Sequence, residues 1–135
     1  MNDLFLVGRI IFGGFFAYNG ISHFLDVAAM ADYTASKGVP MPELAVMLSG
    51  ALLVFGGFSV LFGFLPRVGL ACIALFLIGV SPVMHNFWYV PEPGLRLNEL
   101  GHFMKNMAML GASLMMLAVP RPWPYSLEER YRIAA

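Results

Sequence analysis

The sequence has few charged residues for its length, and it has a single cysteine. Only 12% of the 135 residues are charged, eight basic and eight acidic, so the formal net charge is zero. Ordinary globular proteins carry roughly twice that charged fraction. So few charges cannot cover a water-facing surface, and the basic stripe that a nucleic-acid binder needs is absent. The lone Cys72 excludes a disulfide framework and a cysteine-based metal site.

Hydrophobic residues are what the sequence has in excess. They make up 59% of the chain, and the mean hydropathy is +0.75. Both values lie well above those of a soluble domain, in which roughly 45–50% of residues are apolar. The composition therefore predicts a protein whose main partner is the lipid bilayer, with no nucleic-acid partner.

Long uncharged runs mark the predicted membrane spans. Between Glu43 and Arg67 there are 23 uncharged residues, and between Arg67 and Glu92 there are 24. A bilayer core about 30 Å thick needs ~20 apolar residues of helix. Two further apolar stretches each contain one charge, Arg9 or Lys105. The pattern predicts one all-α domain over residues 1–135, an integral membrane four-helix bundle with spans at about 4–25, 44–65, 68–90 and 100–119.

The distribution of basic residues predicts the orientation. An uncleaved first helix is favoured over a signal peptide, because its apolar stretch exceeds the usual 7–15 residues and Met1-Asn2-Asp3 carries no positive charge. With the N-terminus in the cytoplasm, five arginines lie inside, against Lys37 and Arg96 outside. The positive-inside rule then places both termini in the cytoplasm. The five are Arg9, Arg67, Arg121, Arg130 and Arg132.

Repeated features and small residues indicate how the spans pack. Glu-Leu precedes the second and fourth spans, and Pro-Arg follows both. This echo indicates either a duplicated two-helix unit or the frequent use of Pro-Arg at cytoplasmic helix ends. Gly13 and Ala17 stand four residues apart, as do Ala108 and Ala112, a spacing that lets helices approach closely in lipid. We therefore expect a tight bundle.

Polar side chains inside the spans fall in one layer near the predicted outer face. Counting at 100° per residue places them on stripes with small residues, which is typical of inward faces. The stripe on the first span has Arg9, Gly13, Gly20 and His23; that on the third has Arg67, Ala71, Ala74, Ser81 and His85; that on the fourth has His102, Lys105, Asn106, Met109 and Ser113. The candidate ligand-binding set of this layer is His23, His85, Asn86, Trp88, His102, Lys105 and Asn106.

Three interpretations of the outer layer compete. The polar groups either satisfy one another between helices or extend to the headgroups. Alternatively, they form a shallow site for a quinone or a similar small molecule, with His85 and Lys105 as donors or proton carriers and Trp88 as a stacking wall. A metal or haem site is the third interpretation, but no His-x-x-His pair occurs, so no metal is predicted. At the other end, Arg9 and Arg67 are expected to be cytoplasmic-side anchors.

Two segments outside the spans are predicted to be short helices. Residues 26–37 form one at the outer interface, ended by Gly38. Ser126 and Glu129 have the spacing of a capping box, which predicts a terminal helix. Between the last span and that helix, Trp123 and Tyr125 are expected at headgroup level.

These residues resemble the DoxX family of small four-helix membrane proteins. The resemblance rests on motifs in order along nearly the whole chain: Gly8-Arg9, Asn19-Gly20-Ile21-Ser22-His23-Phe24, Lys37-Gly38-Val39-Pro40, Gly56-Gly57 with Gly63 and Arg67, His85-Asn86-Phe87-Trp88, and Phe103-Met104-Lys105-Asn106 with Gly111. It implies a bacterial inner (cytoplasmic) membrane protein with several spans. It also implies a link to quinone-dependent oxidation of sulfur compounds and to other redox proteins.

Together, the residues and the resemblance predict a small integral membrane subunit of a quinone-linked redox complex. Its shallow polar site lies near the outer face, quinone is the expected cofactor, and a redox protein is the expected partner. A non-catalytic scaffold or assembly subunit is the alternative, as is a small-molecule permease. Association into a homo-oligomer also remains open.

Overall fold

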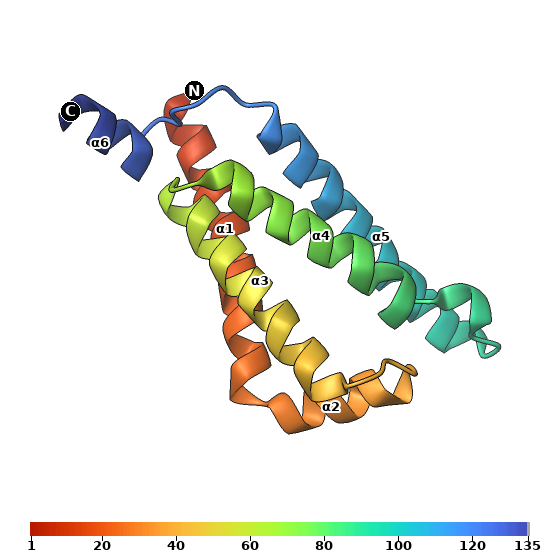
Figure 1. Ribbon diagram of the computed structural model, residues 1–135. Coiled ribbons are helices and arrows are strands. Elements are labelled where there is room, and N and C mark those ends of the chain that lie inside the picture. Colours follow the sequence, from red (N-terminus) through yellow and green to blue (C-terminus); the bar gives the residue numbers. More distant parts are fainter. Residues whose placement is uncertain (135) are drawn as a thin grey trace.

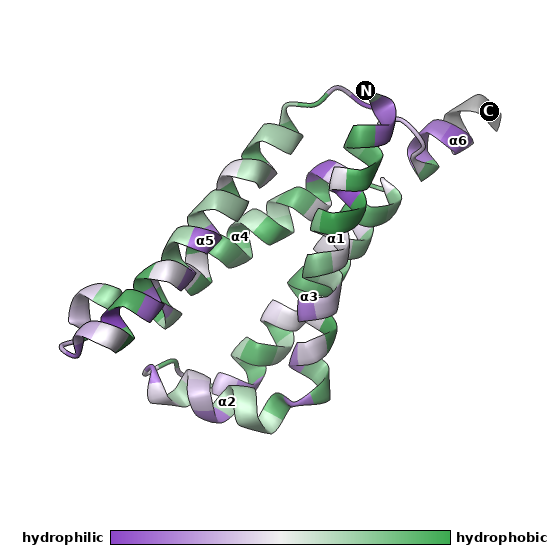
Figure 2. Ribbon diagram, turned by 180° about the vertical axis from the view of Figure 1, so that it is seen from behind, coloured by the Kyte–Doolittle hydropathy of each residue, from purple (hydrophilic) through white to green (hydrophobic). Residues whose placement is uncertain are grey.

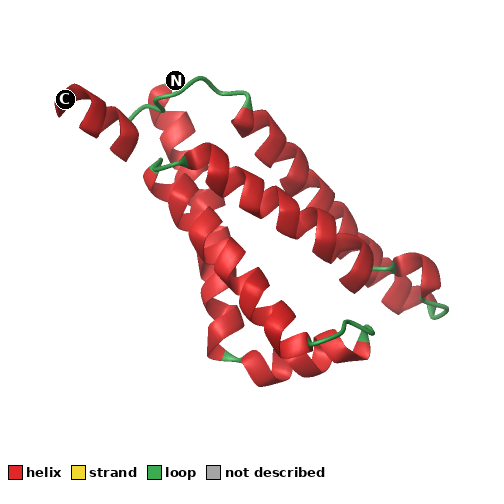
Figure 3. Cartoon of the chain, viewed as in Figure 1, coloured by secondary structure: helices red, strands yellow, loops and turns green. Residues whose placement is uncertain are grey.

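The computed structural model describes residues 1–134, with side chains as far as Tyr131, so the side chain of Arg132 lies outside the described residues. This part of the chain contains helices and no strand, which confirms the all-α prediction. The helices are α1 (Asn2–Leu25), α2 (Val27–Ser36), α3 (Pro42–Phe62), α4 (Pro66–Met84), the 3-10 helix η1 (Phe87–Tyr89), α5 (Pro93–Leu117) and α6 (Leu127–Ala134). Figure 3 shows how little loop joins them.

Local signals in the sequence explain where these helices begin and end. Proline occupies the first turn of α3, α4 and α5, where its missing N–H costs no hydrogen bond. Gly63 ends α3 in the left-handed conformation, with φ of 63°. The two predicted short helices are present as α2 and α6. At α6, the Ser126 hydroxyl accepts a hydrogen bond of 3.0 Å from the Glu129 N–H, as in a capping box.

Three helical stretches within residues 1–134 are long and apolar enough to cross a membrane. They are Asn2–Leu25, Pro42–Phe62 and Pro66–Tyr89. Although α5 has 25 residues, it is more polar than these three because its middle contains His102, Lys105 and Asn106. Figure 2 shows mostly apolar residues along α1, α3 and α4, and polar residues within α5. The fourth span and the orientation of the termini remain predictions.

The four long helices form two pairs that diverge. α1 packs along α3, α3 packs on α4, and α4 packs on α5, while α2 lies against α3. The chain termini and the turn between α3 and α4 share one end of the molecule, which we call the terminus end (Figure 1). At the opposite end, the loop end, the α1–α3 pair with α2 separates from the α4–α5 pair with η1. The arrangement is thus more open than the predicted tight bundle.

Glycines bring α1 and α3 into backbone contact. A Cβ atom at Gly13 would lie 2.7 Å from the Leu61 nitrogen, and one at Gly57 would overlap the backbone of Ala17. Gly20 is equally confined, since its Cβ would lie 2.5 Å from the Val54 nitrogen. The predicted close approach at Gly13 and Ala17 is therefore confirmed for this pair of helices.

The buried face of α4 differs from the predicted stripe. Ala74 and Ser81 are buried as expected, but Arg67 and Ala71 are exposed. Because α4 packs between α3 and α5, its apolar side chains turn inward. The buried residues are Pro66, Gly69, Leu70, Ile73, Ala74, Leu77 and Ser81.

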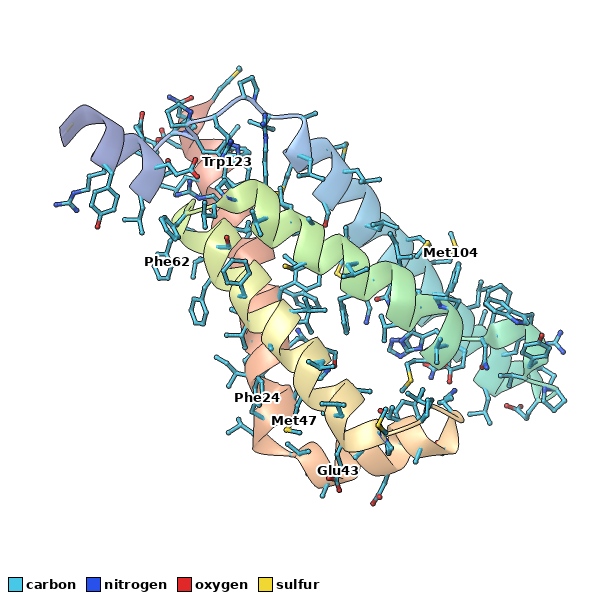
Figure 4. All side chains as sticks on the ribbon, in the orientation of Figure 1. Phe24, Glu43, Met47, Phe62, Met104 and Trp123 are labelled. Atoms are coloured by element: carbon cyan, nitrogen blue, oxygen red, sulfur yellow. The ribbon has the colours of Figure 1, made fainter. Side chains whose placement is uncertain are left out.

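The segment after α5 returns to the terminus end and completes the core there. Trp123 is 1% exposed and lies edge-on to Phe5, with 5.2 Å between ring centroids; Figure 4 shows it beside the first turns of α1. Trp123 is thus buried within the protein and does not face lipid, because the proline-rich segment folds back over α1; its depth at headgroup level stays a prediction. Tyr125, by contrast, is exposed.

Candidate functional site

A pocket lies at the loop end, where α3 and α4 separate. Its volume is about 550 Å³, and its residues come mainly from α2, α3 and α4, with His23 of α1 and His85 after α4. Leu48 and Leu52 line the α3 side, and Leu75 and Val83 line the α4 side. The volume falls in the range of roughly 300–1,000 Å³ that is usual for small-molecule sites. The pocket is therefore an apolar site bounded by a few polar groups.

Two of the predicted site residues, His23 and His85, line this pocket. The Nδ1 atom of His23 lies 2.8 Å from the Asn19 carbonyl oxygen one turn earlier. Because a carbonyl oxygen only accepts, Nδ1 of His23 carries a proton. Tyr33, Thr34 and Ser49 add hydroxyl groups to the lining. The polar groups of the pocket thus come from helices on both sides of the gap.

Glu99, directly before the predicted span at 100–119, joins the two halves of the loop end. One carboxylate oxygen of Glu99, in α5, lies 3.0 Å from Nζ of Lys37, which caps the C-terminus of α2. Its other oxygen lies 2.8 Å from Nδ1 of His85, which caps the C-terminus of α4. The three side chains are only 15–19% exposed. We call this set, Lys37, Glu99 and His85, the loop-end bridge.

The contacts within the bridge shift the pKa values of Lys37 and Glu99. Burial opposes the charge of Lys37, but the hydrogen bond to Glu99 and the nearby Tyr33 outweigh it and raise the pKa of the ammonium. Burial opposes the charge of Glu99 too, but hydrogen bonds from His85 and Lys37 hold the pKa of the carboxyl below its ordinary value of 4.5. Both groups are thus charged near neutral pH.

His102 and Lys105 lie on the other side of the bridge. The His102 ring stacks on the His85 ring, with centroids 5.0 Å apart and an angle of 15° between the planes. Nζ of Lys105 lies 3.2 Å from Nδ1 of His102. Neither residue lines the pocket; both line a separate shallow hollow of about 490 Å³ with Gly94 and Gly101. The structure therefore links these two residues to the pocket only through His85.

The remaining three candidates occupy other environments. Trp88 packs on Phe87 and Phe103 in an aromatic cluster at η1 and does not line the pocket. Asn86 precedes η1, where its carbonyl accepts a hydrogen bond of 3.0 Å from Tyr89. Asn106 is 6% exposed within α5. The single predicted layer thus divides into a pocket, a hollow, an aromatic cluster and a buried amide.

The predicted anchors at the terminus end also differ from each other. Arg9 is 2% exposed, and it donates hydrogen bonds of 3.2 Å and 3.0 Å to the carbonyls of Pro124 and Tyr125. Arg67 is exposed on α4. Arg9 therefore ties the C-terminal segment to α1, whereas Arg67 is available to the surroundings. Among the side chains described, no three histidine, cysteine or acidic groups gather as a metal site would require.

Comparisons with known proteins identify a family and a relative to which the chain is similar. The family model described as DoxX matches residues 4–86. The chain is also 28% identical over 127 residues to a protein named inner membrane protein YphA, from Escherichia coli strain K12. That alignment covers 94% of the chain and 89% of the relative. No solved structure matches the chain.

Proposed function

The chain belongs to the DoxX family, and from that premise we propose that it binds a quinone in the pocket between α2, α3 and α4, as a small subunit of a redox complex. It is a multi-pass inner membrane protein. Because quinones dissolve in the bilayer, a binding protein for them needs a pocket among its membrane helices. The partner subunit would supply the electron carrier.

The composition of the pocket is the observation that carries this proposal. Leucine and valine side chains of α3 and α4 match the apolar tail of a quinone. The ring oxygens of the quinone need polar partners, and the lining offers the imidazoles of His23 and His85 besides its hydroxyl groups. A bound quinone would accept two electrons and two protons, and a bound quinol would release them. His85, held by Glu99, is placed to exchange one of those protons with the ligand.

We also propose that α5 is the fourth span and that both termini face the cytoplasm. α5 has 25 residues, enough to cross the bilayer core, and it packs along α4 (Figure 1). Its polar residues lie toward the loop end, where lysine can reach the headgroups. Reporter fusions at residues 38, 64 and 90 and at the C-terminus test this topology. Periplasmic signals at residues 38 and 90 alone are expected.

Filling the pocket tests the quinone site. Gly79 lines the pocket, and a Cβ placed there meets nothing within 4 Å, so Gly79→Leu should occupy the pocket without disturbing the fold. Gly111→Leu is the matched control, because Gly111 is an equally open position on α5. Purified protein in nanodiscs would be titrated with decylubiquinone and decylubiquinol.

We expect the binding of at least one redox form to weaken by roughly tenfold or more in Gly79→Leu, from loss of tail burial, and to be unchanged in Gly111→Leu. Circular dichroism of both variants would check that the helices remain folded. Equal binding by Gly79→Leu and the wild type would contradict the proposed site. No binding by the wild type, together with loss of a partner protein when the gene is deleted, would favour a scaffold instead.

A further inference from the structure

Glu99 is held in place from two sides by segments that lie far apart in the sequence. One of its carboxylate oxygens receives Lys37 at 3.0 Å, and the other receives His85 at 2.8 Å. Lys37 is followed by Gly38 in the left-handed conformation, with φ of 77°, so α2 ends at this contact. With one partner on each oxygen, the carboxylate has little freedom to rotate.

This arrangement determines which nitrogen of His85 carries the proton. A carboxylate can only accept hydrogen bonds, so the Nδ1 atom that faces Glu99 must be protonated. In neutral His85 the other nitrogen, Nε2, is then an acceptor with a free lone pair. The stacked ring of His102, 5.0 Å away and nearly parallel, further restricts rotation of the His85 ring.

The other ionisable groups around the bridge do not compete for that lone pair. Lys37 is bound to the other oxygen of Glu99, and its Nζ atom lies over the Tyr33 ring, 5.4 Å from the ring centroid. Lys105 is in contact with His102. His23, across the pocket on α1, is bound to the carbonyl of Asn19. None of these groups is hydrogen-bonded to Nε2 of His85, and because His85 lines the pocket we assign a ligand there as the partner of that atom.

We infer that Glu99 is a positioning residue that makes His85 a hydrogen-bond acceptor toward the pocket, so that the pocket prefers the quinol over the quinone. The inference rests on the proposed function. The hydroxyl group of a quinol can donate to Nε2, whereas the carbonyl oxygen of a quinone cannot. Glu99 acts through His85 and does not itself line the pocket.

Glu99→Gln tests the inference because it should reverse the tautomer. A glutamine would turn its oxygen toward the Lys37 ammonium and its amide N–H₂ toward His85. Nδ1 would then be the acceptor, and the proton would move to Nε2. Lys37→Met is a comparison variant that breaks the bridge but keeps the His85–Glu99 contact. Glu92→Gln is the charge-matched control. It removes the same charge from a glutamate near Glu99 that caps the N-terminus of α5 through Gly94 and Leu95 and does not belong to the loop-end bridge.

The first readout needs no ligand. ¹⁵N nuclear magnetic resonance of histidine-labelled protein in nanodiscs, with assignments from single histidine variants, reports the protonated nitrogen. We expect the Nδ1–H tautomer of His85 in the wild type, Lys37→Met and Glu92→Gln, and the Nε2–H tautomer in Glu99→Gln. An Nε2–H tautomer in the wild type, or no change in Glu99→Gln, would overturn the inference.

The second readout is binding of decylubiquinol and decylubiquinone. We expect the wild type and Glu92→Gln to bind the quinol roughly tenfold more tightly, as for one hydrogen bond, and Glu99→Gln to lose or reverse that preference. Equal affinity of the wild type for both forms would overturn the quinol preference. If neither form binds while the tautomers behave as expected, the proposed function fails and the positioning of His85 by Glu99 stands.

Discussion

The interface between α3 and α4 is built differently at its two ends. At the terminus end, a Cβ placed on Gly56 would lie 2.9 Å from the Gly69 carbonyl oxygen, and one on Gly69 would overlap Ser59. At the loop end, the same helices face each other across a pocket, and a Cβ on Gly79 would meet nothing. Small residues thus give close packing where the helices cross. Where the helices separate, charged side chains hold the halves together instead.

The contrast between glycine packing and charged contacts predicts that stability comes mainly from the close glycine contacts, those of α3 with α1 included. Gly57→Ala should have the largest effect, because its new methyl group overlaps the backbone of Ala17, which cannot move aside as a side chain would. We expect the free energy of unfolding to fall by about 3 kcal/mol. Reversible unfolding by SDS in mixed micelles would measure it. Gly14→Ala is the control, since that position is open; equal stability of the two variants would contradict the proposed packing.

Removing the arginine at the terminus end should have the next largest effect. Arg9→Met leaves the carbonyls of Pro124 and Tyr125 without their donor. We expect a loss of about 2 kcal/mol, since hydrogen bonds to a charged group contribute more than neutral ones. Limited chymotrypsin digestion should then cut the segment around Trp123 faster. Arg67→Met, at an exposed position, should leave the rate of digestion unchanged. Equal rates of cleavage in the two variants would contradict the role of Arg9 in holding the C-terminal segment on α1.

A matched pair of glycines on α4 tests the contrast directly. Gly69→Ala should destabilise by about 1–2 kcal/mol, because its methyl group meets Ser59, whose hydroxyl is bound to the carbonyl of Leu65 at 3.0 Å. Gly79→Ala should be neutral or stabilise by up to ~1 kcal/mol, as alanine favours helix. Thermal unfolding of both variants in detergent is the measurement. Destabilisation by Gly79→Ala would mean that the loop end is closed.

The smallest effect on stability is expected at the loop-end bridge. Lys37→Met should cost only about 0.5 kcal/mol, as is usual for an ion pair in contact with water. It should nevertheless broaden the distance between spin labels at residues 35 and 98, measured by double electron–electron resonance. Lys37→Arg should keep the narrow distribution. A narrow distribution in Lys37→Met would show that the bridge does not hold the two halves together.

The bridge should respond to pH through Glu99. Its pKa is lowered by hydrogen bonds from His85 and Lys37, against the effect of burial. The stabilisation is therefore fully present above the ordinary pKa of 4.5 and is lost as the pH falls through the lowered value. The same spin-label distances should broaden only below that pH, and they should be independent of pH in Glu99→Gln.

The sequence predicted the elements better than their arrangement. Uncharged runs located the long helices, Gly38 and the capping box located α2 and α6, and the small-residue spacing at Gly13 predicted a close helix approach without naming the partner helix. These are local signals, set by neighbours along the chain. The separation of α3 from α4 depends on contacts between distant segments, which no local pattern encodes. Polar residues therefore appeared as one layer although α5 directs them to different sides.

The loop-end bridge was missed for the same reason, although a signal for it existed. Lys37 was assigned to the predicted outer side, and Glu99 directly precedes the fourth predicted span, which begins on that side. They are 62 positions apart, and charge alone could not tell that pair from Lys37 with Glu43 or Glu92. His85 was identified as a candidate by its place in the third span, but the carboxylate that orients it was not.

The contact of Arg9 with the C-terminal segment has a consequence for biosynthesis. α1 enters the membrane early in translation, whereas Pro124 and Tyr125 are added more than a hundred residues later. Until then the guanidinium group is an unpaired charge at the end of an apolar helix, which is costly in a membrane. A chain truncated before Pro124 would keep that defect permanently. The last part of the chain to be made therefore supplies the hydrogen-bond partners that the first helix lacks until then.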